Sequence, residues 1–333
     1  MKTTFLGKSG FKISVIGIGL WQIGSRFWNF RNNSIEKTCL EIVENAYKGG
    51  INFYDTAEIY GNGLSEKYLG LAIRKLGIRD NVVIASKVAG YKYTEESIVK
   101  AVKKTSERLG FKPDLIQHHW LPPFYSNICR VINIYEKLVD QGYVSLYGLS
   151  NFNEKYLVKA IECSKKYEPV SNQVQYNLGY RVVENNLINI MEKYRLTLIS
   201  WSPLAKGALS GLSNPNTTAQ KRDSVFKGVI RDRDLQNLLN NLANKYGVSK
   251  STIALAWLVH KKAVPIPGTR NPARIIDYVK AGEIELSASD LEALDSVSNK
   301  YVTKWGSSYS SLSIMRYIPG FVQNLVFKLI DGI

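Results

Sequence analysis

Short apolar stretches with the character of β-strands alternate with longer amphipathic stretches along most of this chain. Such an alternation is typical of a parallel sheet, and eight strand–helix units close naturally into a (β/α)8 barrel. One barrel also accounts for the length of 333 residues without a linker. The eight predicted strands are Val15–Leu20, Ile51–Tyr54, Val82–Ser86, Leu115–His119, Val144–Leu149, Val170–Tyr176, Thr197–Ser200 and Ala263–Pro265.

The stretches between these strands have the apolar spacing of helices that cover a sheet. Between Thr94 and Leu109, apolar residues such as Ile98, Ala101 and Val102 recur at three- and four-residue intervals and would share one face. Other helices are predicted at 34–48, 128–141, 154–166 and 187–194. Because no change in composition marks a linker, we predict one domain over residues 1–333, with a core at about 3–299 and a C-terminal helical tail at 300–333.

Three segments depart from the repeat. Residues 3–14 are predicted to form a small hairpin that caps the bottom of the barrel. Residues 203–231 form a long polar stretch, and such loops are usually functional or disordered. The tail contains an apolar stretch at 321–330 that is too short to span a membrane, so we expect it to pack on the barrel or on a partner subunit.

Composition and charge exclude several classes of protein. With 45% hydrophobic and 22% charged residues, the chain is expected to fold, and its excess of 44 Lys and Arg over 28 Asp and Glu gives a net charge of +16. No long run of like charges and no helix-turn-helix or zinc-finger pattern occurs, so we expect an anionic small ligand rather than nucleic acid.

The three cysteines lie far apart and only three histidines are present, so neither a disulfide framework nor a metal site is expected. No signal sequence or membrane-spanning stretch is found, which predicts a soluble, cytoplasmic protein.

Side chains that carry chemistry follow three neighbouring strands of the predicted barrel, at the ends where barrel enzymes hold their functional residues. Asp55 and Tyr60 follow the second strand, Lys87 follows the third, and His118 and His119 end the fourth. A nearby ammonium stabilises a phenolate, so Lys87 would bring proton donation by Tyr60 toward neutral pH, and Asp55 would keep that ammonium charged. A histidine could donate a hydrogen bond to a carbonyl oxygen. Because successive strand residues point to opposite sides, only one of the two histidines enters the barrel, and position alone does not say which.

Together these segments resemble the aldo-keto reductase family. The sequences NFYDTAEIYG at 52–61, ASK at 85–87 and DLIQHHW at 114–120 are similar to its motifs on strands two, three and four. The resemblance covers roughly residues 3–299 and implies NADPH-dependent reduction of an aldehyde or ketone, with Tyr60 as the acid–base residue and Lys87 and Asp55 as its modulators. It also selects His119, because the family's histidine directly precedes a tryptophan.

The same resemblance implies where NADPH or NADP⁺ would bind. The sequence GLSNF at 148–152 resembles the family segment that holds the nicotinamide carboxamide, a glutamine shares this task, and an aromatic residue stacks on the nicotinamide. These matches assign to the cofactor Ser150, Asn151, Gln173, Trp201, Ser202 and Leu204. No Gly-x-Gly-x-x-Gly or Walker sequence is present at the expected places, so a Rossmann or P-loop interpretation fails.

The phosphates of the cofactor are expected at the loop after strand eight, which opens a helix. Arg274 matches the family's phosphate-binding arginine, whose planar fork suits the 2′-phosphate of NADPH, and Thr269 matches its hydroxyl partner. The family often has lysine where Gly268 stands, and Arg270 is expected to compensate. Asp277 lies where the family has an acidic residue near the adenine.

Trp21, Tyr91 and Trp120 are predicted to line a pocket for a small carbonyl substrate. Core packing is the alternative for Trp21, and outward packing is an equal interpretation for several of the other aromatic residues in the loops. Two alternatives stay open. Lys87 could be the nucleophile of a Schiff-base aldolase, or the chain could be a non-catalytic NADPH-sensing module, as some members of the family are subunits of channels. The oligomeric state and the choice among aldehydes, ketones and sugars are left open by the sequence.

Overall fold

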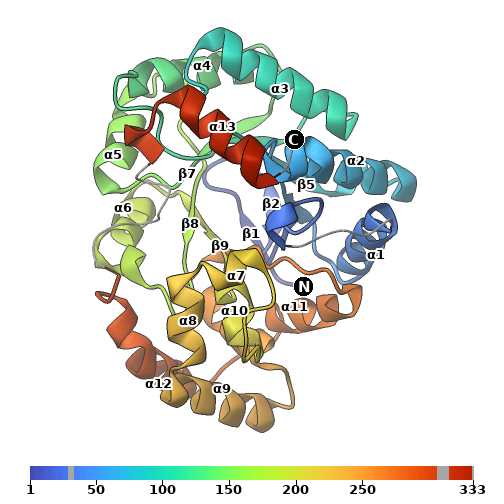
Figure 1. The fold of residues 1–333 in the computed structure, drawn as a ribbon, viewed down its shortest axis with the longest axis vertical. Coiled ribbons are helices and arrows are strands. Elements are labelled where there is room, and N and C mark those ends of the chain that lie inside the picture. The colour runs from blue at the N-terminus through green and yellow to red at the C-terminus, as the bar shows by residue number, and fades with distance from the viewer. Residues whose placement is uncertain (29–33, 306–314, 332–333) are drawn as a thin grey trace.

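Eight parallel strands wind around a common centre in the computed structural model, which describes residues 1–28, 34–305 and 315–331 (Figure 1). Their order in the sheet follows the chain, from β3 to β10. Each predicted strand has a counterpart, and the bounds are β3 Ile18–Gly19, β4 Phe53–Asp55, β5 Val83–Val88, β6 Leu115–His118, β7 Leu146–Ser150, β8 Ser171–Gln175, β9 Thr197–Trp201 and β10 Val264–Pro265. The predicted (β/α)8 barrel is therefore confirmed.

The first and last strands meet through backbone hydrogen bonds. The amide of Gly17 donates to the carbonyl of Pro265 at 2.9 Å, and the amide of Gly19 donates to the carbonyl of Pro267 at 3.1 Å. These contacts bring the C-terminal ends of all eight strands to one rim, which is where barrel enzymes place their functional side chains.

A short antiparallel hairpin covers the opposite end of the barrel, as the sequence predicts. It pairs β1 (Thr3–Phe5) with β2 (Lys12–Ser14). From this hairpin Leu6 and Ile13 join a buried apolar cluster that includes Phe53, Leu115 and Ile199 of the barrel strands. This cluster closes the bottom of the barrel, so the rim is the end that remains open to a ligand.

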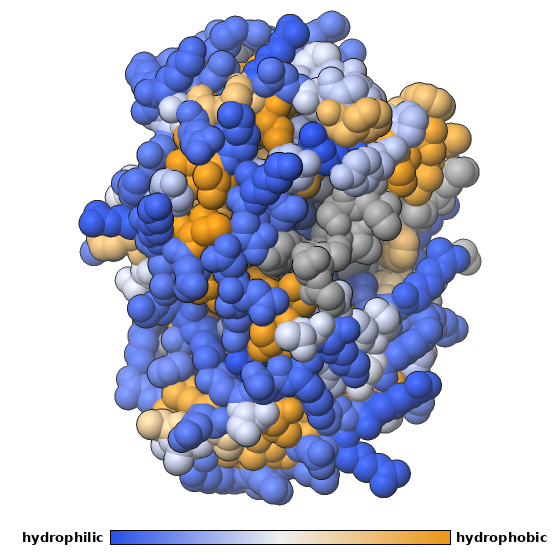
Figure 2. All heavy atoms as spheres, turned by 90° about the vertical axis from the view of Figure 1, so that its left-hand side faces the viewer, coloured by the Kyte–Doolittle hydropathy of each residue, from blue (hydrophilic) through white to orange (hydrophobic). Residues whose placement is uncertain are grey.

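Amphipathic helices surround the sheet, and their ends follow ordinary capping chemistry. The predicted helix after β5 is α3 (Glu95–Leu109), which begins with a capping box between Thr94 and Ser97 and ends at Gly110 with a left-handed φ of 81°. The other helices of the first half are α1 Ile35–Lys48, α2 Leu64–Leu76, α4 Ile128–Asp140, α5 Glu154–Cys163 and α6 Leu187–Lys193, and those of the second half are α9 Arg233–Tyr246, α10 Lys250–His260, α11 Ile275–Ala281 and α12 Ala288–Ser298. The face that carries α5 and α6 is mostly hydrophilic, with apolar residues showing in small patches (Figure 2).

The polar segment 203–231 is largely helical, so the expectation of an irregular loop is wrong. It forms the 3-10 helix η5 (Ala205–Ser210) and the short helices α7 (Thr218–Lys221) and α8 (Ser224–Ile230). Side chains at Thr217 and Asp223 cap α7 and α8. These local hydrogen bonds explain how a polar stretch with many turn-forming residues is ordered.

The described part of the tail crosses the rim as helix α13 (Gly320–Asp331), shown in red in Figure 1. Its Gln323 is fully buried and accepts a hydrogen bond from the indole of Trp120 at 2.9 Å. Its other face is open, since the side chains of Phe321 and Leu325 are 77% and 56% exposed. The prediction that the tail packs on the barrel is thus confirmed for one face of α13, and burial of the other face against a partner subunit stays a prediction. Residues 306–314 and 332–333 lie outside the described residues.

One expectation about the cysteines is wrong. Cys129 of α4 and Cys163 of α5 form a disulfide, with their Cα atoms 5.0 Å apart, while Cys39 is free and buried. The two cysteines are separated by 34 residues, and neighbouring helices of the barrel bring them together. In the part of the chain that the structure describes, no cluster of histidine, cysteine and acidic side chains could hold a metal ion, and no helix is long and apolar enough to cross a bilayer.

Candidate active site

A cavity of about 820 Å³ opens at the C-terminal rim of the barrel. Three residues in its wall, Asn151, Ser202 and Lys206, have φ values of 60°, 49° and 55°. Residues other than glycine rarely adopt this left-handed conformation, and such strain clusters at functional sites. The backbone around the cavity is therefore held in a shape that packing elsewhere must stabilise.

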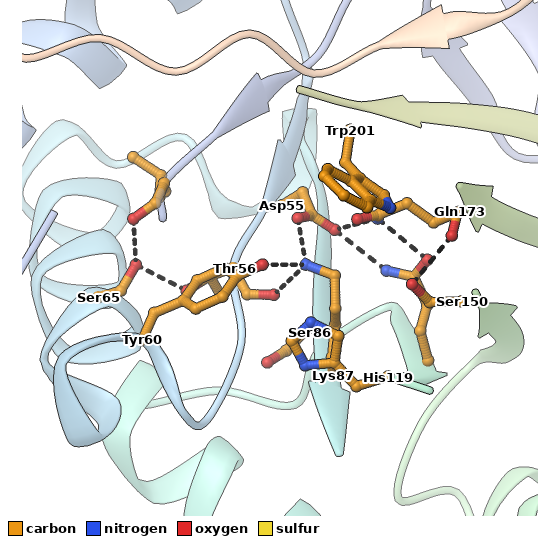
Figure 3. Close-up of polar contacts among 12 residues, drawn as sticks. Asp55, Thr56, Tyr60, Ser65, Ser86, Lys87, His119, Ser150, Gln173 and Trp201 are labelled. Carbon is orange, nitrogen blue, oxygen red and sulfur yellow. Dashed lines mark hydrogen bonds and ion pairs between the residues drawn. The ribbon is translucent and has the colours of Figure 1, made fainter. Parts of the chain in front are cut away.

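Lys87 lies at the centre of the predicted catalytic group and is fully buried (Figure 3). Its ammonium forms an ion pair with Oδ1 of Asp55 and donates to the backbone carbonyl of Thr56 at 3.0 Å and to the hydroxyl of Tyr60 at 3.3 Å. Burial by itself lowers the pKa of Lys87, but the charges and hydrogen bonds of Asp55 and Tyr60 outweigh it and raise that pKa. The ammonium thus stays charged directly beside the phenol.

The position of Tyr60 is set by a tight turn after β4. Tyr60 begins the 3-10 helix η2 (Tyr60–Gly63), and Gly61 in this turn has a φ of 56°. A Cβ atom at Gly61 would lie 2.6 Å from the carbonyl oxygen of Gly24, so only glycine allows the turn to approach the loop after β3 this closely. The turn presents the phenol to the cavity and to Lys87.

The two adjacent histidines face opposite sides of β6, as strand geometry requires. His118 points outward, where its Nδ1 lies 3.0 Å from the hydroxyl of Tyr135 on α4. His119 lines the cavity, and its ring centre lies 5.8 Å from that of Tyr60. Burial, helped by the charges of Lys87 and His118, lowers the pKa of His119 well below its usual value, so its imidazole is neutral at neutral pH.

A second buried network holds the other oxygen of Asp55. Oδ2 accepts one hydrogen bond from the side-chain amide of Gln173 at 2.8 Å and one from that of Gln117 at 3.0 Å. Gln117 was missed by the sequence analysis. A signal was available, because a polar residue two positions before His119 on the same strand faces the same side, into the barrel.

Most residues assigned to the cofactor by the resemblance lie in the wall of this cavity. Trp201 donates from its indole to Oδ1 of Asn151 at 3.0 Å, and the amide of Asn151 donates to the hydroxyl of Ser150 at 3.0 Å. Figure 3 shows the ring of Trp201 above Asp55 and Gln173. The lining residues among these candidates are Ser150, Asn151, Gln173, Trp201, Ser202, Leu204, Gly268, Thr269, Arg270 and Arg274.

The loop after β10 forms the opposite end of the cavity, with two departures from expectation. The guanidinium of Arg270 donates to the backbone carbonyl of Trp28 at 2.8 Å, so this side chain bridges two loops. Asp277 does not line the cavity, whereas Tyr278, its neighbour on helix α11, does. Arg274 is exposed at the cavity wall.

The predicted substrate residues are divided between the cavity and the tail. Trp21 and Trp120 line the cavity, close to Tyr60 and His119, with ring-centre distances of 6.2 and 4.9 Å. Tyr91 does not line it, because its hydroxyl instead donates to the Asn324 side chain of α13 at 3.2 Å. Phe27, Trp28 and Ile59 also contribute to the wall, together with Leu212, Asn216, Thr217 and Gln220 of the segment 203–231.

The sequence of residues 15–299 matches the model of the Aldo/keto reductase family. The chain belongs to this family. A solved structure of an aldo-keto reductase from Klebsiella pneumoniae in complex with NADPH has the same fold, with a TM-score of 0.75 and 24% identity over 93% of this chain and 98% of that one.

Among curated relatives, a putative aryl-alcohol dehydrogenase of Schizosaccharomyces pombe is 30% identical to this chain. Its alignment covers 87% of this chain and 93% of the relative. A putative voltage-gated potassium channel subunit beta of the same yeast is also 30% identical, over 89% of this chain and 92% of the relative. Relatives of both kinds thus match this chain along most of their length.

Proposed function

We propose that this aldo/keto reductase reduces an aldehyde or ketone to an alcohol, reversibly, with NADPH as the hydride donor. The observation that carries the proposal is that the buried Lys87 ammonium contacts both Asp55 and the hydroxyl of Tyr60, and that Asp55, Tyr60 and His119 line one cavity. A phenol, a charged amine and a neutral imidazole at one point can deliver a proton to a carbonyl oxygen.

The residues of the cavity fit a nicotinamide dinucleotide phosphate. The indole of Trp201 offers a flat surface for a ring, and Gln22 in the same wall has a buried Oε1 without a hydrogen-bond partner in the described structure. Arg274 and Thr269 at the far end offer a guanidinium and a hydroxyl, which are suitable donors to a phosphate. These groups would hold the cofactor along the cavity.

When bound, NADPH supplies a hydride to the carbonyl carbon of the substrate. Tyr60 gives its phenolic proton to the carbonyl oxygen, and the adjacent Lys87 ammonium stabilises the phenolate that remains. His119 is neutral and donates a hydrogen bond that orients the same oxygen. Trp21 and Trp120 exclude water from one side of the reacting group.

The test is the variant Tyr60→Phe, assayed by NADPH oxidation with a panel of aldehydes, ketones and sugars. Loss of the general acid should lower turnover by about 10²- to 10⁴-fold while NADPH binding, measured by fluorescence titration, stays intact. Tyr167→Phe is the matched control, because the hydroxyl of Tyr167 contacts Asp140 on the surface, away from the cavity. Reduction by Tyr60→Phe at the rate of the unchanged protein would refute the mechanism.

A non-catalytic module is the second candidate, favoured by the similarity to the potassium channel subunit beta. It predicts NADPH binding with negligible turnover on every substrate of the panel. A Schiff-base aldolase is disfavoured, because that chemistry needs a neutral lysine and the Lys87 ammonium is held by an ion pair that raises its pKa.

A further inference from the structure

Gln117, a buried glutamine of β6, is hydrogen-bonded to Asp55, but the mechanism above gives it no role. We propose that Gln117 is a positioning residue, which fixes the Asp55 carboxylate so that its other oxygen stays on Lys87 and the ammonium stays on Tyr60. This inference rests on the proposed function, which supplies the role of Tyr60.

The geometry is a closed triangle of side chains inside the barrel. The amide nitrogen of Gln117 donates to Oδ2 of Asp55 at 3.0 Å, and its amide oxygen accepts from Gln173 at 3.2 Å. Gln173 completes the triangle with its own bond to Oδ2 at 2.8 Å. Gln117 is fully buried, and it lies in register with Lys87 on one side and Gly148 on the other. Because Gly148 has no side chain, the glutamine has room beside it.

Amide donors suit this place because a buried carboxylate must have its lone pairs satisfied. A second cation at Oδ2 would compete with Lys87, whereas a neutral amide satisfies the oxygen and leaves neutralisation of the charge to Lys87. Of the two amides, Gln173 lies in the cavity wall, where it can also meet a bound ligand, while Gln117 does not. Gln117 is therefore the donor whose only polar contacts in the described structure are within the network.

The charged and titratable groups around Tyr60 come from several elements. Asp55 and Glu58 lie on β4 and the turn after it, Lys87 lies on β5, and the neutral His119 directly follows β6. Across the cavity, η5 contributes Lys206, which is paired with Asp223 at 2.5 Å, and the loop after β10 contributes Arg270 and Arg274. The residues 320–326 of α13, which packs on η2, include no charged side chain. Of these groups, only Asp55 is bonded to Gln117.

Removing the amide should raise the pKa of the Tyr60 phenol. Without the positive end of the amide dipole at Oδ2, the negative charge of Asp55 acts more strongly on Lys87 and on Tyr60, which disfavours the phenolate. In Gln117→Leu, which keeps the size of the side chain, we expect a rise of about 0.5–1 pH unit. In Gln117→Glu, which keeps the shape and adds a negative charge when ionised, the rise should be larger.

The pKa of Tyr60 can be measured without turnover, by ultraviolet titration of tyrosinate in each protein minus the same protein with Tyr60→Phe. The alkaline limb of the pH profile of aldehyde reduction should shift by the same amount. Ser200→Ala is the matched control, since Ser200 is a buried polar residue of β9 whose hydroxyl donates to the carbonyl of Tyr176 and, among the described residues, to no group of the Asp55 network. It should leave both measurements unchanged.

A merely structural role for Gln117 would lower the melting temperature of the variants and leave the pKa of Tyr60 in place, and that result would overturn the inference. Since Gln117→Glu preserves the shape of the side chain, it keeps the test decisive if Gln117→Leu does not fold. If the titration shifts but no carbonyl compound is reduced, the proposed function fails and the positioning of Asp55 by Gln117 stands.

Discussion

Replacing Lys87 by methionine separates the structural from the chemical role of the buried ion pair. Methionine keeps most of the lysine stem but leaves the Asp55 carboxylate, which is 1% exposed, without a counter-charge. Removing one partner of a buried pair costs about 3–5 kcal/mol. For 333 residues, an unfolding entropy of roughly 2 cal/mol/K per residue converts that cost to a fall in melting temperature of about 4–7 °C.

The double variant Asp55→Asn/Lys87→Met should recover most of this loss, because it leaves neither charge buried alone. Urea unfolding of the four proteins at pH 7.5 gives the coupling free energy, which we expect to be several kcal/mol. Carbonyl reduction should stay abolished in the double variant, because Tyr60 has lost its ammonium. Additive losses in the cycle, or a Lys87→Met protein as stable as the unchanged one, would refute the reasoning.

Two further predictions concern the cofactor and pH. Arg274→Ala should weaken NADPH binding about 10- to 150-fold in fluorescence titration, since a charged hydrogen bond contributes roughly 1.5–3 kcal/mol, and should hardly affect NADH. Equal losses with both cofactors would contradict a contact with the 2′-phosphate. Burial lowers the pKa of His118 to about 3 and that of His119 well below its usual value. In the unfolded chain both titrate near 6.5, so the unfolding free energy should fall below that pH by up to about 1.4 kcal/mol per unit for each histidine, and a stability that is flat between pH 7 and 5 would disprove this.

The barrel and its rim could be predicted from the sequence because both depend on patterns that run along the chain. Apolar strands and amphipathic helices have different periods, and a closed parallel barrel brings every strand end to one rim whatever the side chains are. Asp55, Lys87 and His119 are therefore close in space although β4, β5 and β6 are far apart in sequence. The helices in segment 203–231 were harder to predict. Those capped by Thr217 and Asp223 are too short to show the periodic spacing of apolar residues that marks a longer helix.

Contacts between side chains of different helices and strands leave no periodic pattern in the sequence from which they could be predicted. The pairing of Cys129 with Cys163 depends on how α4 lies against α5, and Tyr91 turns to α13 because Asn324 of the tail offers an acceptor there. The direction of Gln117 could be predicted, because strand alternation turns it into the barrel once His119 is placed there. Its hydrogen-bond partner could not be predicted, because other side chains of the barrel strands also point inward. In the structure the amide of Gln117 donates to the carboxylate of Asp55, which is buried and therefore needs hydrogen-bond donors for its lone pairs.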